Sequence, residues 1–436
     1  MLPAIRTSIA MLAMVTIAWA SPAFGQIQTV ILRGDSAPTA GAVFRKFRVP
    51  YLSDASGERI AFRATSKGAG GAIKGLYRLD ATGAGTVIIQ KDEFFLSQRF
   101  RNFKRPAINS SADIAWFAFL SGGKRGVFRT VGATSPVPIT MTFQPTPLGG
   151  FFTDLGPPEI TDSGAVIFWG ETSVAGMEEG LFRCQGGDGD CFSSGGTGTM
   201  DALVTSGTAV PDRSGRSFCT FEDGLHQSSY GIAFRSDTKL NCLNSSEVAL
   251  PGVFRMDLSG SAGIETVALE GESTQLISGQ TAVYDRFRDR PSIRDDGTVV
   301  FRADTAGNFE TEAIFRCDPA SCPAAAAEIL YAKGDLDAGM NELRRFSRPQ
   351  IADNGDIAFQ AKPRGLTAGG PTIYLRRSSG VLDTVATKGD PVPGSSPATL
   401  FRRLGLHNLS ASGSLAFRAK VKGNTVPTNT GIFLVP

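Results

Sequence analysis

The sequence repeats one short motif seven times, and this repeat constrains the fold more than any other feature of the chain. In the copy FSRPQIADNGDIAF, residues 346–359, an apolar run ending at Ile351 meets an Asp-Asn-Gly turn and then a second apolar run, 357–359. Asn and Gly tolerate the positive φ that tight hairpin loops require, so each copy predicts a β-hairpin. The other copies span residues 47–62, 103–117, 155–168, 221–234, 287–301 and 404–417.

Each predicted hairpin is followed by two more strand signatures. The first is a short apolar-aromatic stretch, such as GLYR at 75–78 or AIFR at 313–316, and the second is a further apolar run, such as TVII from Thr86. Four short strands per unit, with roughly 50 to 67 residues between equivalent phenylalanines, is the pattern of β-propeller blades. The 51 glycines, 30 phenylalanines and many short Val, Ile and Phe runs favour the same all-β class.

The two ends of the chain complement one another. The seventh unit reaches Pro436 just after its third strand, whereas QTVILRGD at 28–35 matches the fourth strand and Gly-Asp turn of another unit, LDTVATKGD at 382–390. A blade shared by both ends removes two open sheet edges. We therefore predict an all-β, seven-bladed β-propeller with four strands per blade, whose last blade is closed by the N-terminal strand.

Residues 1–25 have the pattern of a secretory signal peptide. They contain Arg6, an apolar run from about Ile9 to Ala20, and small residues before two candidate cleavage points, Ser21 and Gln26. The apolar run is shorter than the ~20 residues of a membrane span. We expect a signal peptide over 1–25, a single propeller domain over 26–436, a secreted or periplasmic location, no membrane span after cleavage, and a monomer.

The six cysteines form three local pairs in the sequence. An even number of closely spaced cysteines in an exported chain predicts disulfides that close loops. The expected pairs are Cys184 with Cys191, Cys219 with Cys242, and Cys317 with Cys322. None has Cys-x-x-Cys spacing and the chain has only two histidines, so we expect no metal site and no cofactor.

Several predicted innermost strands begin with a basic-aromatic pattern. If these strands line the channel, the basic residue before the anchoring aromatic or Leu rings its mouth and favours an anionic ligand, such as a sulfated or uronic-acid glycan or a phosphate. This residue is basic in four units: Lys46, Arg286, Arg345 and Arg403. The alternative is a structural ladder in which these charges pair with acids of the blade junctions, Asp35, Asp335 and Asp390.

A second repeated charge follows the third strand of five units. Repetition at so many equivalent positions favours a structural role in packing and pairing. These residues are Arg78, Arg129, Arg183, Arg255 and Arg316. With a formal net charge of +3, we expect no nucleic-acid partner.

The sequence carries no recognised catalytic motif. There is no Gly-x-Ser-x-Gly elbow, no P-loop and no His-Glu-x-x-His, and His226 and His407 lie in units far apart in the sequence. Trp169 with the nearby acids Glu171, Glu178 and Glu179 is a candidate for sugar hydrolysis, which needs two carboxyls ~5 to 10 Å apart. Solvated loop glutamates are the alternative.

The hairpin copies ADNGDIAF at 352–359, SASGSLAF at 410–417 and TDSGAVIF at 161–168, with the junctions GDSAP and GDPVP, resemble secreted bacterial proteins with tandem NxxGxxAF repeats. The resemblance covers nearly all of 27–436 and implies export and a propeller-like repeat, without supplying catalytic residues. The leading Asn of the motif is kept only at Asn109, where Ala112 replaces the Gly.

Two functional hypotheses follow from these observations. The first is a secreted β-propeller that acts as a binding or interaction module for a carbohydrate or another extracellular partner, through the face formed by the long, variable loops. The second is a carbohydrate-active enzyme, a glycoside hydrolase or polysaccharide lyase, on the same scaffold. Converging acids in a pocket, or a histidine beside Arg and Tyr, would favour the enzyme.

Overall fold

The protein is described by a computed structural model. The described residues are 27–53, 58–80, 83–130, 135–185, 191, 198–222, 224–258, 263–275, 281–306, 311–320, 322, 327–365, 370–393, 395, 399–423 and 429–436. The predicted signal peptide, residues 1–25, lies outside them.

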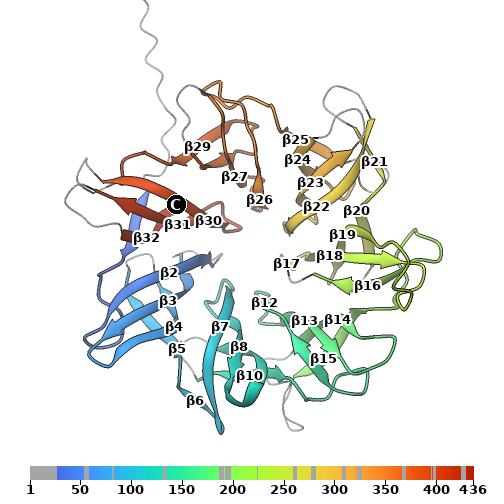
Figure 1. The fold of residues 1–436 in the computed structure, drawn as a ribbon, viewed down its shortest axis with the longest axis horizontal. Helices are drawn as coiled ribbons and strands as arrows, with labels where there is room; N and C mark the ends of the chain where they lie inside the picture. The colour runs from blue at the N-terminus through green and yellow to red at the C-terminus, as the bar shows by residue number, and fades with distance from the viewer. Residues whose placement is uncertain are drawn as a thin grey trace, which may run out of the picture.

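Seven antiparallel sheets follow one another around a central axis, as Figure 1 shows, and we number them as blades in chain order. Blade 1 contains β2 (Val43–Leu52), β3 (Ile60–Gly68), β4 (Gly71–Leu79) and β5 (Gly85–Gln90). Blade 2 contains β6 (Phe94–Phe95), β7 (Gln98–Ile108), β8 (Ile114–Leu120), the 3-10 turn η1 (Ser121–Gly123), β9 (Arg125–Thr130) and β10 (Val137–Met141). Blade 3 contains β11 (Phe152–Leu155), β12 (Glu159–Ile160), β13 (Val166–Thr172), β14 (Glu179–Gln185) and β15 (Thr199–Thr205).

The remaining blades keep this order of strands. Blade 4 contains β16 (Ser217–Phe221), β17 (His226–Gln227), β18 (Gly231–Lys239), β19 (Leu250–Asp257) and β20 (Ile264–Leu269). Blade 5 contains β21 (Ser273–Gln275), β22 (Thr281–Ile293), β23 (Val299–Ala306), β24 (Thr311–Cys317) and β25 (Glu328–Ala332). Blade 6 contains β26 (Ser347–Ile351), β27 (Ile357–Ala361), β28 (Thr372–Arg376) and β29 (Leu382–Thr387), and blade 7 contains β30 (Leu400–Leu409), β31 (Leu415–Lys422), β32 (Asn429–Val435) and β1 (Gln28–Leu32).

The predicted seven-bladed ring and its closure are confirmed. Strand β1 pairs antiparallel with β32, with Gln28 opposite Leu434 and Leu32 opposite Gly431, so the N-terminal strand is the outer strand of blade 7. In Figure 1 the N-terminal strand, in blue, lies beside the C-terminal strand β32. The N-terminal strand therefore covers the edge of β32 and gives blade 7 its fourth strand.

The innermost strand is interrupted in blades 3 and 4. In blade 3, β11 and β12 both pair with β13, but Pro157 and Pro158 lie between them and have no N–H to donate. In blade 4 a break after Phe221 separates β16 from β17, and both pair with β18. The short outer-rim strands β6 and β21 were not predicted from the sequence.

The hairpin turns explain why glycine recurs in the motif. Gly164, Gly355 and Gly413 have φ values of 85°, 86° and 96° in equivalent turns. A side chain in this left-handed region is strained, so glycine is favoured there. Ala112, which replaces the glycine in blade 2, has φ 65° and keeps the same turn.

Each blade is built around a cluster of aromatic rings. In blade 3 the Phe152 ring packs edge-on against Phe182, with centroids 4.9 Å apart, and Phe168 stacks on Phe182 at 5.9 Å. Blade 7 repeats the arrangement with Phe401, Phe417 and Phe433 at the equivalent positions. The apolar faces between blades also pack, so the core is a ring of seven clusters.

The predicted cysteine pairs are confirmed. Their Cα–Cα distances, all suited to a disulfide, are 6.0 Å for Cys184–Cys191, 5.2 Å for Cys219–Cys242 and 5.6 Å for Cys317–Cys322. Within the described part of the chain, no helix has the length and apolar character needed to cross a membrane.

Candidate functional site

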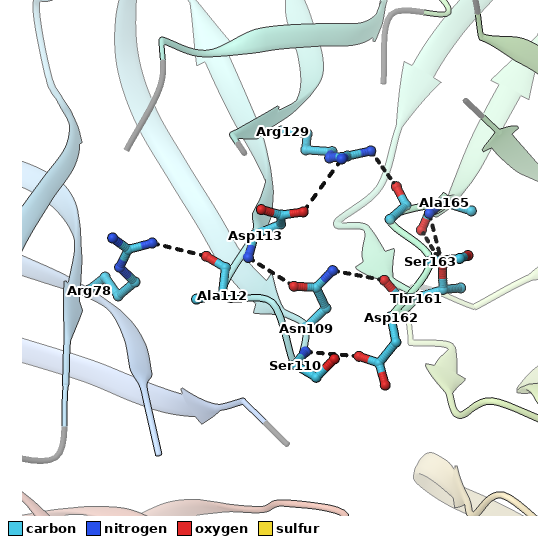
Figure 2. A network of polar contacts seen from close by, with 11 residues as sticks. Arg78, Asn109, Ser110, Ala112, Asp113, Arg129, Thr161, Asp162, Ser163 and Ala165 are labelled. Carbon is cyan, nitrogen blue, oxygen red and sulfur yellow. Dashed lines mark hydrogen bonds and ion pairs between the residues drawn. The ribbon is translucent and has the colours of Figure 1, made fainter. Parts of the chain in front are cut away.

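Arginines of the third strands hold neighbouring blades together. Arg78 of β4 donates to the carbonyl of Ala112 at 3.1 Å, and Arg129 of β9 donates to the carbonyl of Gly164 at 2.6 Å. Figure 2 shows that both arginines reach from their own blade to the hairpin turn of the next blade. Arg129 also pairs with Asp113, which lies in the hairpin turn of its own blade. The structural interpretation of these repeated arginines is confirmed, since the remaining three also make ion pairs: Arg183 with Asp201, Arg255 with Glu265, and Arg316 with Glu328.

The hairpin turns are also linked to one another around the channel. The backbone N–H of Ser110 donates to Asp162 at 2.8 Å, as Figure 2 shows for blades 2 and 3. The N–H of Ser229 donates to Asp295 at 2.7 Å, and the N–H of Asp295 donates to Asp353 at 2.9 Å. The rim aspartates therefore connect blades 2 to 3 and 4 to 5 to 6, which gives them a structural role.

A cavity of about 440 Å³ occupies the channel on the side of these turns, and we call it the turn-side cavity. All seven blades contribute to its lining, because each innermost strand ends there. Tyr51, Glu159, His226 and Arg290 are the lining side chains nearest the middle of the innermost strands. The Nδ1 atom of His226 accepts the N–H of Ile293 at 3.2 Å, which fixes the imidazole across blades 4 and 5.

Three arginines from three blades converge beside this cavity. Glu159 of blade 3 pairs with Arg290 of blade 5 at 2.6 Å and with Arg105 of blade 2 at 3.5 Å. Arg348 of blade 6 is 9% exposed, and its Nε and Nη2 atoms have no hydrogen-bond partner among the described residues. We call Arg105, Arg290, Arg348 and Glu159 the interior arginine cluster.

The charges of these arginines act on one another and on His226, and that of Arg348 also acts on His407. Burial, followed by the repulsion of Arg348 and Arg105, lowers the pKa of Arg290 to about 9. Burial and the positive charges of Arg290, Arg348 and Arg105 hold the pKa of His226 well below its usual value. Burial and Arg348 lower the pKa of His407 to about 4, so both imidazoles are neutral at pH 7.

A second cavity, of about 470 Å³, is lined by residues of blades 6, 7, 1 and 2, and we call it the basic cavity. Its lining includes six cationic side chains and no carboxylate: Arg48, Arg63, Arg105, Arg403, Arg418 and Lys420. Tyr51 and Arg105 connect it with the middle of the channel, since Tyr51 lines both cavities. The basic cavity is therefore a concave surface of strongly positive charge.

The structure divides the predicted ring of basic residues into two pairs. Arg403 lines the basic cavity and Lys46 lines an adjoining pocket of about 130 Å³ beside Arg48 and Arg63, whereas Arg286 and Arg345 line neither cavity. All four side chains are exposed. The role of this ring in binding stays a prediction.

The alternative pairing of this ring with the junction acids does not form among the described residues. Asp35, Asp335 and Asp390 accept backbone N–H groups three residues earlier instead, each at 2.7 Å. Their carboxylates close the Gly-Asp turns, which explains why the acid recurs in the junctions.

The candidate glutamates Glu178 and Glu179 have structural partners. Glu179 accepts the N–H of Phe221 at 2.8 Å and the indole N–H of Trp169 at 3.3 Å, and thus joins blade 3 to blade 4. Burial raises the pKa of Glu179. Glu178 accepts the N–H of Gly176 at 2.9 Å. In contrast, His407 is fully buried, and neither of its ring nitrogens has a hydrogen-bond partner among the described residues.

Sequence reasoning missed most residues of the two cavities. The three interior arginines each precede the proline of the innermost strand, and this Arg-Pro pair recurs at 105–106, 290–291 and 348–349. Arg63 and Arg418 directly follow the phenylalanine that ends the hairpin motif. Both patterns are visible when the seven copies of the motif are aligned. Whether each arginine is paired or free of an ion pair depends, however, on the residues that face it from other strands and blades.

Solved structures with similar folds have very low sequence identity to this chain. An acylaminoacyl peptidase from Pyrococcus horikoshii matches with a TM-score of 0.46 and 10% identity over 89% of this chain, and the match spans 51% of the peptidase. A protein of unknown function from Dyadobacter fermentans matches with a TM-score of 0.38 and 11% identity over 94% of this chain and 99% of its own. The lectin SapL1 matches with a TM-score of 0.35 and 11% identity over 80% of this chain and 97% of its own.

The chain spans about half the length of the peptidase. No curated protein sequence matches it. Residues 97–435 match the family of unknown function DUF7453, and the chain belongs to this family.

Proposed function

We propose that this member of a family of unknown function is an exported β-propeller that binds an anionic carbohydrate in the basic cavity. The observation that carries the proposal is the set of six cationic side chains around a cavity whose lining has no carboxylate. A concave surface of one sign focuses the field and attracts ligands of the opposite charge. The three disulfides and the predicted signal peptide support export.

A comparison between blades argues against a purely structural role for these charges. The residue after the hairpin phenylalanine is arginine in four blades, and in blades 4 and 5 it is neutralised. Arg235 pairs with Glu222 at 2.6 Å, and Arg302 pairs with Asp289 at 2.8 Å. In blades 1 and 7 the equivalent Arg63 and Arg418 have no ion-pair partner among the described residues, although Arg63 donates a hydrogen bond to the carbonyl of Phe103 in blade 2.

The inner-strand residues opposite these arginines explain the difference. Blade 4 has Glu222 directly after its anchoring phenylalanine, whereas blade 1 has Arg48 at that position and blade 7 has Gly405. Burial and the nearby Arg48 lower the pKa of both Arg63 and Arg418, because the like charges repel one another. An anionic ligand would relieve this repulsion, as Glu222 does for Arg235.

The composition of the cavity favours a polar ligand over an apolar one. Besides the cations, it offers the Gln360 side chain and the phenol of Tyr51, with few aliphatic groups. Its volume lies within the range of ~300 to 1,000 Å³ that small-ligand sites occupy. A short segment of a uronic-acid or sulfated glycan combines the required negative charge with many hydroxyl groups, and guanidinium groups bind carboxylates and sulfates through paired hydrogen bonds.

The test is a glycan array probed with residues 26–436 and with two double variants. In Arg63→Gln with Arg418→Gln, we expect the binding of acidic glycans to fall by at least tenfold, while neutral glycans remain unbound. The matched control is Arg286→Gln with Arg345→Gln, which removes the same charge outside the cavity. Equal binding by both double variants would contradict the proposal, and a loss confined to the control would point to the predicted ring instead.

One observation favours a second candidate function, a polysaccharide lyase. His226 and Tyr51 line the same cavity as Arg290, which is the combination of base, phenol and guanidinium that proton abstraction beside a uronate carboxylate uses. Incubation with uronic-acid polysaccharides would then release products whose unsaturated uronic acid absorbs ultraviolet light. If wild-type protein binds these polymers without producing this absorbance, the lyase is excluded and the binding module stands.

A further inference from the structure

The interior arginine cluster carries more positive charge than the described residues around it neutralise. Two guanidinium groups, Arg105 and Arg290, share the carboxylate of Glu159, and the buried guanidinium of Arg348 repels that of Arg290 without an ion pair of its own among the described residues. Arginine remains protonated at neutral pH, even where burial lowers its pKa. The neighbouring histidines are neutral and add no charge, so the cluster holds two uncompensated positive charges.

Arg348 is the member of the cluster that lacks a partner. Its backbone N–H donates to Asp289 at 2.9 Å, but this carboxylate is also paired with Arg302 at 2.8 Å. The guanidinium of Arg348 is buried, and its Nε and Nη2 atoms find no acceptor among the described residues. The Nε atoms of Arg105 and Arg290 are buried without an acceptor as well.

An uncompensated buried cation is strongly unfavourable, and proteins rarely keep one without a counter-ion. The excess positive charge repels these arginines from one another, since Arg348 and Arg105 both lower the pKa of Arg290. The turn-side cavity, lined by Arg290 and His226, offers an entrance to the cluster and has room for a bound ion with its water. Buried guanidinium nitrogens without acceptors, as on Arg348, are donors that an anion could satisfy.

We propose that the interior arginine cluster binds a small oxyanion with two negative charges, such as sulfate or hydrogen phosphate, within the channel. The anion balances the two excess charges and accepts hydrogen bonds from the unpartnered guanidinium groups of Arg348 and its neighbours. Bound there, it joins blades 2, 5 and 6 across the channel. The inference does not rest on the proposed glycan binding, because Arg290 and Arg348 do not line the basic cavity, and Arg105 is the one member of the cluster that does.

The test measures thermal unfolding and calorimetric binding in sodium sulfate and in sodium phosphate, at an ionic strength held constant with sodium chloride. We expect one sulfate or phosphate per chain and a melting temperature that rises by about 3 °C when the anion is present at one hundred times its Kd. The absence of binding to either anion in wild-type protein would overturn the proposal.

Two variants separate a specific site from the general effect of sulfate on protein stability. Arg348→Gln removes the unpartnered charge, so we expect it to lose the anion-dependent rise and to melt at a higher temperature than wild type when no anion is present. Arg45→Gln, at an exposed position outside the cluster, has the same charge change and should keep the full rise. Equal responses of the two variants would refute the site.

A third variant distinguishes this proposal from the glycan proposal. Arg63→Gln with Arg418→Gln should lose acidic glycans and keep the sulfate response, because both residues belong to the basic cavity. If Arg348→Gln does not fold, Arg348→Lys provides the second variant. It keeps the charge, loses the planar fork, and should bind sulfate about tenfold more weakly. An unchanged affinity in Arg348→Lys would contradict the proposed hydrogen bonds.

Discussion

Replacement of Glu159 by Gln tests whether the charges in the channel interact as strongly as their positions indicate. Glu159 is the only carboxylate in ion-pair contact with the interior arginine cluster among the described residues, at 2.6 Å from Arg290 and 3.5 Å from Arg105. The side chains of Glu159 and Arg290 are 14% and 7% exposed, so water screens the pair only weakly. Glutamine preserves the shape and one acceptor but removes the negative charge.

The expected loss of stability is large for a single isosteric change. Two unit charges ~4 Å apart interact by about 4 kcal/mol at an effective dielectric constant of ~20. Removal of one partner from a buried ion pair typically destabilises a protein by about 3–5 kcal/mol. For ~400 residues this corresponds to a fall in melting temperature of about 4–6 °C.

The assay is urea or thermal unfolding of wild type, Glu159→Gln, Arg348→Gln and the double variant. Because Arg348→Gln removes part of the repulsion, we expect Glu159→Gln to destabilise that background less than it destabilises wild type. Sulfate should restore part of the loss in the single variant. A change below about 1 kcal/mol in wild type would refute the reasoning, since it would mean that water screens the cluster almost completely.

Three further predictions concern the scaffold. Replacing Cys219 and Cys242, which lie 23 residues apart, by Ser should lower the free energy of unfolding by about 3 kcal/mol in urea titrations, because a loop of this length is freed in the unfolded chain. Gly164→Ala should destabilise the protein by more than about 2 kcal/mol, since φ is 85° and the added Cβ would lie 3.0 Å from the buried guanidinium of Arg129. The control Gly34→Ala, with φ 103° and open space around the added Cβ, should destabilise the protein by only about 1 kcal/mol. Equal losses of stability in the two variants would contradict the steric argument. Burial, followed by repulsion from a neighbouring aspartate, raises the pKa of Asp353 from 3.8 to about 6, so its contribution to stability is complete below pH 3.8 and is lost as pH rises through 6. Asp353→Asn should therefore stabilise the protein by about 0.5 kcal/mol at pH 7 after screening by water and have less effect at pH 4; a gain that is equal at both pH values would exclude titration of this group.

The blades were predictable because their signals are local. Each hairpin motif contains its own turn residues and its own alternating apolar positions, and the aromatic cluster of a blade comes from three strands that follow one another in sequence. Even the closure by β1 was visible, since QTVILRGD matches the fourth strand of other units. The break between β11 and β12 was also encoded locally, by Pro157 and Pro158, although it was not predicted.

The site was only partly predictable because it depends on contacts between blades. Arg63 and Arg235 occupy the same position of the repeat, yet one faces a basic cavity and the other is neutralised by Glu222. The Arg-Pro pairs mark the interior arginines in the sequence, but nothing local reveals that blades 2 and 5 direct theirs toward one carboxylate of blade 3 while that of blade 6 has no ion pair among the described residues. Long-range geometry decides which repeated charges are structural and which remain without a partner.

The pairing of β1 with β32 has a consequence for how the chain folds. Gln28 lies opposite Leu434, so blade 7 joins two segments separated by nearly the whole length of the described chain. Blades 1 to 6 contain only contacts between neighbouring segments and can form as soon as each is synthesised, whereas blade 7 must wait for both of its parts. We therefore expect the last step of folding to be the pairing of β1 with β32, a contact of very high sequence separation. A chain in which this pairing has not formed would present two unpaired strand edges to other copies of itself.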